Sequence, residues 1–348
     1  MHIGTNLNNT PSGIRCCCSD QNCEVAKQSK TSIETLNKKI SHLTEQLKMN
    51  ARDLEFISVS DDKCLYYTGI SSFKTVQHLF NYLKDNISQP HCNFTKEQVF
   101  VMTLTKLRLN HQFQTLAYDY KVCPNTISKY FHRTLEIIDR CLGYALEMPD
   151  KNVLSNHTPK RFKDQFGDRR ILIIDCFEVR SETPENPKAA VSHFSNYKKS
   201  ETTKFLISIC PDGNIAFISP GYGGRCSDKK IVQDSGILNY IEAGDVIIAD
   251  KGFDIADLVE SKGAILNIPL FLINKRQFRP AEIEKNRQVT KLRIHVERCI
   301  AGLKNKFLII SQIIPVGLLV RFENDKNIVD LVARVCCILY NFNPSIIK

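Results

Sequence analysis

Two short apolar runs, each followed by an aspartate, predict the central strands of a covered β-sheet. The first run, ILII at residues 171–174, leads into Asp175, and the second, VIIA at residues 246–249, leads into Asp250. Continuous apolar runs with β-branched residues are typical of strands that are buried on both faces. Because ligand sites in such sheets gather at the carboxyl ends of the strands, we expect both aspartates at one functional edge.

The segment between these runs predicts two more strands. Residues 204–210 and 215–219 are mostly apolar and flank a PDGN turn signal. Together with the first run, they would form an antiparallel meander. A glycine-rich loop at residues 221–228 follows and leads into a helix, for which Ser227 or Asp228 would be the N-cap.

A long amphipathic helix is predicted over residues 281–307. Its apolar residues recur at steps of three and four positions. They are Val289, Leu292, Val296, Ile300, Leu303 and Phe307. Glu297 follows directly on this stripe, at the border of the buried face, where an acid can reach the end of a sheet. With Asp175 and Asp250 it would form an oxygen-rich pocket suited to a pair of Mg²⁺ or Mn²⁺ ions.

Each of these acids also has a purely structural interpretation. Glu297 could pair with Arg293, one helical turn before it, on a solvated surface. Asp175 and Asp250 could be turn residues that follow a strand. The coincidence of all three, two of them after apolar runs, favours a site.

Residues 61–147 predict helices throughout and form a candidate DNA-binding region. Within it, residues 113–131 fit a helix, a short turn and a second helix, with Pro124 at the start of the second, where its missing N–H costs nothing. The second helix would expose short polar donors and cations suited to base edges and phosphates in a major groove. These residues are Asn125, Thr126, Ser128, Lys129, His132 and Arg133. The alternative is a helical packing module whose polar face is merely solvated.

The N-terminal part predicts a disordered segment over residues 1–28 and a short coiled-coil helix over residues 29–56. The helix carries a heptad-like apolar seam at Ile33, Leu36, Ile40, Leu43, Leu47 and Leu54. Self-pairing into a homo-oligomer through residues 33–54 is favoured over packing on the chain's own domain. Cys16–Cys18 and Cys23 would suggest zinc, but no histidine or second CxxC follows at finger spacing.

Charge adds a preference for a polyanionic partner. Lys and Arg number 47 against 37 Asp and Glu, a formal charge of +10, which favours DNA or RNA. Residues 148–169 form a basic linker that could follow phosphates, act as a nuclear import signal or simply be solvated. The 43% hydrophobic content is enough for a real core, and the length suits about two domains.

Cysteine usage and the apolar stretches bear on the compartment. The fourteen cysteines are scattered, and the chain begins without an apolar signal core, so we expect an intracellular setting with free thiols. The longest apolar stretch, residues 307–320, is interrupted by polar residues and is too short for a membrane span.

Five motifs, in order, resemble PIF/Harbinger-type transposases, and most of all the DDE-superfamily endonuclease domains found beside THAP zinc domains. The motifs are IDCFEV at 174–179, SNYK at 195–198, GGRCSDK at 223–229, ADKGF at 249–253 and RIHVER at 293–298. The resemblance runs from about residue 61 to the C-terminus and includes the helix-turn-helix stretch. It implies an α/β fold with an RNase H-like mixed sheet flanked by helices over residues 170–342. No THAP zinc pattern is present in the N-terminal part.

The resemblance assigns catalysis and metal binding to Asp175, Asp250 and Glu297. It implies an endonuclease that depends on divalent metal, cleaves DNA phosphodiester bonds and can transfer strands in transposition. In our hypothesis Asp175 bridges two Mg²⁺ or Mn²⁺ ions, with Asp250 on one and Glu297 on the other; one ion activates the attacking oxygen and the other stabilises the leaving oxygen. A domesticated DNA-binding protein without nuclease activity is the alternative.

Further contacts and partners complete the expectation. Phosphate contacts are predicted for Lys198, Arg225, Lys251, Arg293 and Arg298. A packed or solvated His295 is favoured over one at the scissile phosphate, and Asp228 is favoured as a helix cap over a fourth ligand. The family implies transposon ends as the DNA, a nuclear location and a separate Myb-like DNA-binding partner protein.

Overall fold

The computed structural model describes residues 20–49, 51–90, 94–151, 153–154, 158–250, 252–269, 279–319, 327–345 and 347. The chain divides into two compact units, Met1–Asn50 and Ala51–Lys348, and each is described by itself. Cys16–Cys18 and most of the predicted disordered segment lie outside the described residues. None of the described helices has both the length and the apolar character that a membrane span needs.

The first unit contains one long helix, α1 (Asp20–Met49). Its predicted apolar seam is open to solvent, since Ile33, Leu36, Ile40 and Leu43 are 47–59% exposed. The predicted helix was too long at its C-terminal end: Leu54 belongs to a separate short helix, α2 (Leu54–Ile57), where it is buried. Asp53 caps α2 through a hydrogen bond from Phe56 N–H to Oδ1 at 3.1 Å, which explains the break in the seam.

The second unit begins with a helical region. After α2 it comprises α3 (Asp61–Thr68), α4 (Phe73–Leu83), α5 (Lys96–Leu109), α6 (Phe113–Tyr120), α7 (Pro124–Leu142) and the 3₁₀ turn η1 (Gly143–Leu146). A capping box of Thr95 and Gln98 starts α5, and residues 99–107 of that helix are all buried. Helix α5 is therefore the central helix of this region, and α2, α3 and α7 pack against it.

The predicted helix-turn-helix is formed by α6 and α7. Lys121 ends α6 in the left-handed conformation, with φ +55°, and Pro124 is the first residue of α7, as expected from its missing N–H. Leu116 and Ala117 of α6 and Ile127 of α7 are buried in the shared core. The two helices therefore pack on each other through apolar side chains.

The C-terminal part is built on a mixed sheet. Its strands are β1 (Ile171–Arg180), β2 (Phe194–Ser195), β3 (Ser200–Ile209), β4 (Ile215–Ile218), β5 (Tyr222–Gly223), β6 (Val246–Ile248) and β7 (Ile265–Asn267). They follow the order β2-β3-β1-β6-β7, and β4 and β5 also pair with β3. The β1-β3-β4 part is the predicted antiparallel meander, whereas β6 is parallel to β1 and β7 is parallel to β6.

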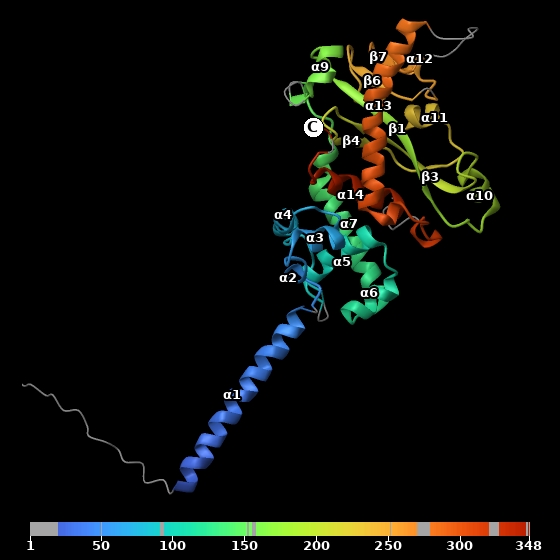
Figure 1. Ribbon diagram of the computed structural model, residues 1–348. Coiled ribbons are helices and arrows are strands. Elements are labelled where there is room, and N and C mark those ends of the chain that lie inside the picture. Colours follow the sequence, from blue (N-terminus) through green and yellow to red (C-terminus); the bar gives the residue numbers. More distant parts are fainter. Residues whose placement is uncertain are drawn as a thin grey trace, which may run out of the picture. The chain divides into compact units, whose positions relative to one another are not determined.

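Helices cover both faces of this sheet (Figure 1). The helices of this part are α9 (Lys160–Phe166), α10 (Pro187–His193), α11 (Asp228–Asp234), α12 (Ala256–Glu260), α13 (Pro280–Lys306) and α14 (Ile328–Asn341), with the 3₁₀ turns η2 (Ile237–Asn239), η3 (Leu308–Ile310) and η4 (Val316–Leu318). Ile171 and Ile173 of β1 share one core with α13 and α14. Leu172 and Ile174 face the other way, into a second core with α11 and α12. Burial on both faces explains why this strand reads as a continuous apolar run.

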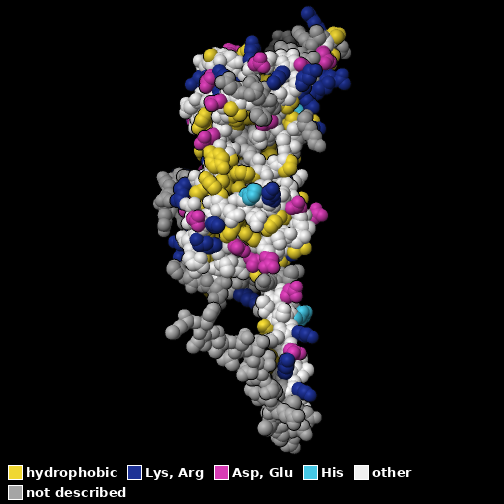
Figure 2. Space-filling view, turned by 90° about the vertical axis from the view of Figure 1, so that its left-hand side faces the viewer, with side chains coloured by type: hydrophobic (Ala, Val, Ile, Leu, Met, Phe, Trp, Pro, Cys, Tyr) yellow, Lys and Arg dark blue, Asp and Glu magenta, His cyan; other side chains and the backbone are white. Residues whose placement is uncertain are grey.

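The helical region and the sheet share one hydrophobic core, because α14 packs on α7 as well as on β4. The segment predicted as a basic linker, residues 148–169, contains α9, whose Phe162 is fully buried. On the face shown in Figure 2, basic and acidic side chains are scattered around a broad area of hydrophobic side chains, and several basic side chains gather near its upper edge. The positive net charge is therefore not spread as one continuous basic surface on this face.

Candidate active site

The two candidate aspartates reach the same level because of the pairing register of β1 with β6. The strands pair in parallel over only three residues, from Ile171 opposite Val246 to Ile173 opposite Ile248. Asp175 and Asp250 each follow the last pair by two positions. A parallel register therefore places the two carboxylates side by side just beyond the end of β6.

The prediction that Asp175 ends its strand was wrong. β1 continues to Arg180 because its other edge stays paired with β3 as far as Thr202. It is β6 that stops, so between Asp175 and Val179 the edge of β1 that faces β6 has no paired strand. At the far end of β1 the same edge is closed again, because Ile314 bonds to the Arg180 oxygen and the Glu182 N–H. This open edge, rather than a strand end, is where the site lies.

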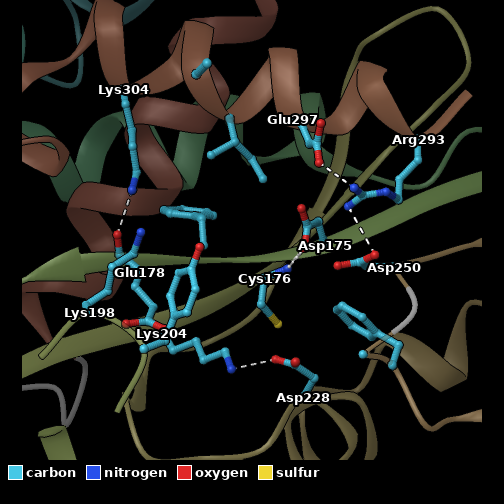
Figure 3. A pocket seen from close by; sticks show the side chains of 16 residues that line it. Asp175, Cys176, Glu178, Lys198, Lys204, Asp228, Asp250, Arg293, Glu297 and Lys304 are labelled. Carbon is cyan, nitrogen blue, oxygen red and sulfur yellow. Dashed lines mark hydrogen bonds and ion pairs between the residues drawn. The ribbon is translucent and has the colours of Figure 1, made fainter. Parts of the chain in front are cut away.

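The third acid comes from α13, which crosses β1 and β6. Val296 and Cys299 of this helix are fully buried, and Glu297 lies at the border of that face with its side chain 46% exposed. All three acids line one cavity of about 650 Å³. Figure 3 shows Asp175, Asp250 and Glu297 grouped at one end of this cavity, which we call the acid end.

Arg293 links two of the three acids. Its Nη2 lies 2.7 Å from Glu297 Oε1, and its Nη1 lies 3.5 Å from Asp250 Oδ1. The i,i+4 ion pair of the alternative interpretation therefore exists, but it is part of the acid end and not of an open surface. Burial, followed by repulsion from Asp250 and Glu297, raises the pKa of Asp175 from 3.8 to about 6, against the opposing effects of the Cys176 N–H and Arg293.

The acid end fits a divalent cation by its chemistry. Its donors are all carboxylate oxygens, which Mg²⁺ and Mn²⁺ prefer. Added positive charge would favour the ionised form of Asp175, whose pKa is raised by burial and then by repulsion from Asp250 and Glu297. Among the described residues, no group of three or more His, Cys, Asp or Glu side chains is already drawn together around one point. In the structure described, the guanidinium of Arg293 supplies the countercharge.

The opposite end of the cavity carries cations, and we call it the lysine end. Lys198, Lys204 and Lys304 line it together with Glu178 and Asp228. Lys204 Nζ lies 2.6 Å from Asp228 Oδ1, and Lys304 Nζ donates to the backbone oxygen of Glu178 at 2.7 Å. This last bond satisfies a carbonyl of β1 on the open edge, where no strand is present.

The helix cap at α11 is Ser227, whose Oγ accepts from the Lys230 N–H at 3.3 Å. Asp228 is therefore not the cap that we favoured: it is the first residue of α11, and its side chain pairs with Lys204. The sequence interpretation also missed Lys204 and Lys304. Lys304 follows Glu297 by seven positions, two helical turns, so the helical period could have placed it on the same face.

The remaining predicted phosphate contacts fall in different places. Lys198 and Arg293 line the cavity. Arg298 and Arg225 are exposed but lie outside its lining. Lys251 lies outside the described residues. His295 is 3% exposed and packs against Phe162, with the ring centroids 5.8 Å apart, so it is a packed histidine, as favoured above, and does not line the cavity.

The six polar residues predicted on the second helix are divided by exposure. Asn125, Lys129 and Arg133 of α7 are exposed. Thr126 and Ser128 are half-buried. His132 is also half-buried, and its ring lies 6.3 Å from that of Phe113 on α6, centroid to centroid. Burial lowers the pKa of His132, so a neutral packing role against α6 is favoured there over a phosphate contact.

Comparison with known families agrees with this layout. Residues 174–341 match the family model described as DDE superfamily endonuclease, and residues 92–143 match that of the helix-turn-helix of DDE superfamily endonuclease. The first match runs from the end of the Ile171–Ile174 apolar run to the last residue of α14, and the second covers α5, α6 and α7. No curated protein matches the chain. The two matches indicate a DDE-superfamily, transposase-like endonuclease with its helix-turn-helix.

Proposed function

We propose that the protein is a transposase-derived, divalent-metal-dependent endonuclease of the PIF/Harbinger type, with an RNase H-like catalytic domain. It would cleave DNA phosphodiester bonds at transposon ends and transfer the cut strand. One observation carries this proposal: three acids from β1, from the segment after β6 and from α13 line the same cavity, although up to 122 positions separate them in the chain. A merely structural role for each acid would not bring them together.

Asp175, Asp250 and Glu297 are the residues that would hold Mg²⁺ or Mn²⁺, in the two-ion arrangement that the family resemblance implies. Bound there, the cations supply charge stabilisation for the attacking and leaving oxygens of a phosphodiester. Asp175 can act as a ligand only in its ionised form, and a bound cation would favour that form against the burial that raises its pKa. Arg293 holds the carboxylates of Asp250 and Glu297 in place.

The lysine end would bind the DNA backbone beside the scissile bond. Two of its cations, Lys204 and Lys304, are partly buried, so their attraction to phosphate is less screened than on the open surface. Burial, and then the nearby Lys198, lower the pKa of Lys304, so an approaching phosphate would stabilise the charged form of this amine. The cavity thus separates a region for metal from a region for phosphate.

The helix-turn-helix would supply docking on duplex DNA. Asn125, Lys129 and Arg133 recur at a step of four positions along α7, so they project from one exposed face. A recognition helix of this kind contacts base edges and phosphates with its N-terminal turns. A separate Myb-like partner protein would add sequence recognition, because no THAP zinc pattern is present to do so.

The exposed seam of α1 would pair with the same seam of a second copy. Ile33 and Ile40 occupy the first apolar position of each heptad, and Leu36 and Leu43 the second. β-Branched residues at the first position with leucine at the second favour a parallel two-stranded coiled coil. A homodimer would present two active sites, one for each end of a mobile element.

We also propose a nuclear location, with the basic segment at residues 160–163 as its signal.

One observation favours a second candidate, a domesticated DNA-binding protein without nuclease activity. Arg293 contacts both Asp250 and Glu297 and so supplies part of the positive charge that a cation would bring. A protein that retained the fold only to bind DNA would tolerate this arrangement permanently. The two candidates differ in whether a divalent cation can bind Asp250 and Glu297 in place of the Arg293 guanidinium.

A nicking assay separates the two candidates. Supercoiled plasmid carrying terminal-repeat DNA is incubated with the full chain and Mn²⁺, and open-circle product is measured. Wild type and Asp254→Asn, an exposed acid four positions beyond Asp250, should nick equally, whereas Asp175→Asn should not. Equal nicking by wild type and Asp175→Asn would refute the catalytic assignment. Binding without nicking by any of the three would establish the second candidate.

A further inference from the structure

The SNYK motif places an exposed aromatic ring at the rim of the cavity. Tyr197 lines the cavity, yet 81% of the residue is exposed. A large apolar ring so open to water gains nothing from folding. Because the ring is exposed beside a site that would bind DNA, it can stack on a planar aromatic group of a ligand.

The backbone holds this ring in a short, closed turn. Tyr197 stands between β2 and β3, where Ser195 pairs with Ser200. Lys199 adopts a left-handed conformation, with φ +53°, and its N–H donates to the Ser195 oxygen at 2.9 Å. The Lys198 N–H donates to Ser195 Oγ at 3.2 Å, and Ser195 itself is buried. The ring is therefore presented by a pre-formed turn.

The second motif, GGRCSDK, supports this turn from below. The Gly224 N–H donates to the Thr202 oxygen at 2.9 Å. A Cβ at Gly224 would collide with Thr202 Oγ1 and would lie 3.1 Å from Ser195 Cβ. Only glycine permits this close approach of Gly224 to Thr202 and Ser195. Two motifs that start 28 positions apart in the chain are therefore in contact beside Tyr197.

The charge around the ring fits a nucleotide. Lys198 Nζ lies over the Tyr197 ring, 4.7 Å from its centroid, and so covers one face. The high exposure leaves the other face open. An open aromatic face beside a lysine is how proteins bind unpaired nucleotides, because the base stacks and the cation attracts the phosphate.

We propose that Tyr197 stacks on a nucleobase displaced from the duplex next to the scissile phosphate, with Lys198 on the phosphate of the same nucleotide. The inference rests on DNA being the substrate, as proposed above. It assigns the SNYK turn to holding an opened strand at the cavity mouth, and the Gly223-Gly224 pair to keeping that turn in place. Pre-ordering of the ring reduces the conformational entropy lost when the base binds.

Fluorescence of 2-aminopurine tests the stacking directly. The probe is a duplex with a single-stranded 3′ overhang that carries 2-aminopurine at its first unpaired position. It is titrated with the full chain in the Asp175→Asn background, which prevents cutting. Stacking on Tyr197 should quench the probe. Tyr197→Phe should keep the quenching, whereas Tyr197→Leu should abolish it and weaken binding about tenfold.

Two controls keep this outcome specific. Tyr66→Leu removes a tyrosine of α3 that is also exposed, 57%, and should change neither quenching nor affinity. A blunt duplex offers no unpaired base, so Tyr197→Leu should weaken its binding less than about twofold. If Tyr197→Leu lost the same affinity for the overhang duplex and for the blunt duplex, Tyr197 would have a merely structural role and the proposal would be overturned.

Quenching that persists in Tyr197→Leu, or that is absent in every protein, would also overturn it. Cleavage by the chain with Asp175 intact is measured separately. Tyrosine-dependent quenching without any cleavage would refute the nuclease and leave the stacking proposal standing. Cleavage combined with quenching that does not depend on Tyr197 would support the nuclease and refute the stacking proposal.

Discussion

The acid end and the lysine end of the cavity contain similar numbers of charged side chains, but they balance charge differently. At the lysine end, Lys204 is paired with Asp228 and Lys304 is bonded to the Glu178 carbonyl. At the acid end, the guanidinium of Arg293 contacts two of the three carboxylates, those of Asp250 and Glu297, and the pKa of the third, Asp175, is raised. Compensated charge at one end stabilises the cavity wall. Uncompensated charge at the other costs stability, which is the usual sign of a functional site.

The sharpest way to test this difference is to remove a carboxylate from the acid end. Glu297→Gln keeps the shape of the side chain and its place beside Arg293, but it loses the negative charge. We expect Mn²⁺-dependent nicking to fall on the order of 10³-fold, because cation charge stabilisation contributes several kcal/mol to such reactions. The initial rate of plasmid nicking measures this loss. Circular dichroism should show unchanged folding.

The matched control for this prediction is Glu284→Gln, an acid on the same helix whose residue is exposed and which does not line the cavity. Its nicking rate should stay within about twofold of the wild type, since substitutions away from a site have small effects. Parallel losses in both variants would contradict the functional contrast between the two ends.

The second prediction concerns the stability that the acid end costs. In the metal-free protein at neutral pH, Asp175 is ionised against its raised pKa, so Asp175→Asn should stabilise the fold while abolishing nicking. A pKa near 6 instead of 3.8 corresponds to at most about 3 kcal/mol in the free energy of unfolding. Thermal unfolding without divalent ions measures the gain. A lower melting temperature for Asp175→Asn would show that its carboxylate is not under electrostatic strain.

The third prediction is a pH dependence with a definite sign. Between pH 4 and pH 6 the folded metal-free protein keeps the Asp175 proton that the unfolded chain has lost. The Asp175 contribution therefore decreases stability as pH rises through this window, and the penalty is fully present above it. Because a bound cation must displace this proton, its affinity should weaken about tenfold for each pH unit below 6.

The measurement is the rise in melting temperature that Mn²⁺ produces at pH 5 and at pH 7.5. We expect a clearly larger rise at pH 7.5 in the wild type. In Asp175→Asn the rise should be small and should depend less on pH. A wild-type rise that is equal at both pH values would separate metal binding from Asp175.

The smallest effect is expected at the lysine end. Lys204→Met leaves the partly buried Asp228 without its partner and should destabilise the fold by about 1–2 kcal/mol. Asp228→Asn alone should cost about 1 kcal/mol, and the double variant should cost less than the sum, because the two side chains contact each other. Urea unfolding of the four proteins gives the coupling energy. Additive losses would mean that the pair does not stabilise the cavity wall.

The local features of this protein could be predicted from its amino-acid sequence. The local pattern of residues placed α6, α7 and α13, and Pro124 marked the start of α7, because helix spacing and capping depend on neighbours along the chain. The same is true of the strand-turn-strand unit around Gly213. The motifs pointed to Asp175, Asp250 and Glu297 for the same reason: a residue after an apolar run is visible without the rest of the molecule.

Where those residues meet depends on the three-dimensional packing of the chain. The length of β1 beyond Asp175 depends on its pairing with β3, and the open edge depends on where β6 ends. Neither can be predicted from the residues next to Asp175 in the chain. The packing of His295 on Phe162, the support of Tyr197 by Gly224 and the sharing of Arg293 between two acids join residues distant in the chain. Burial and charge act through space, so sequence spacing alone could not reveal them.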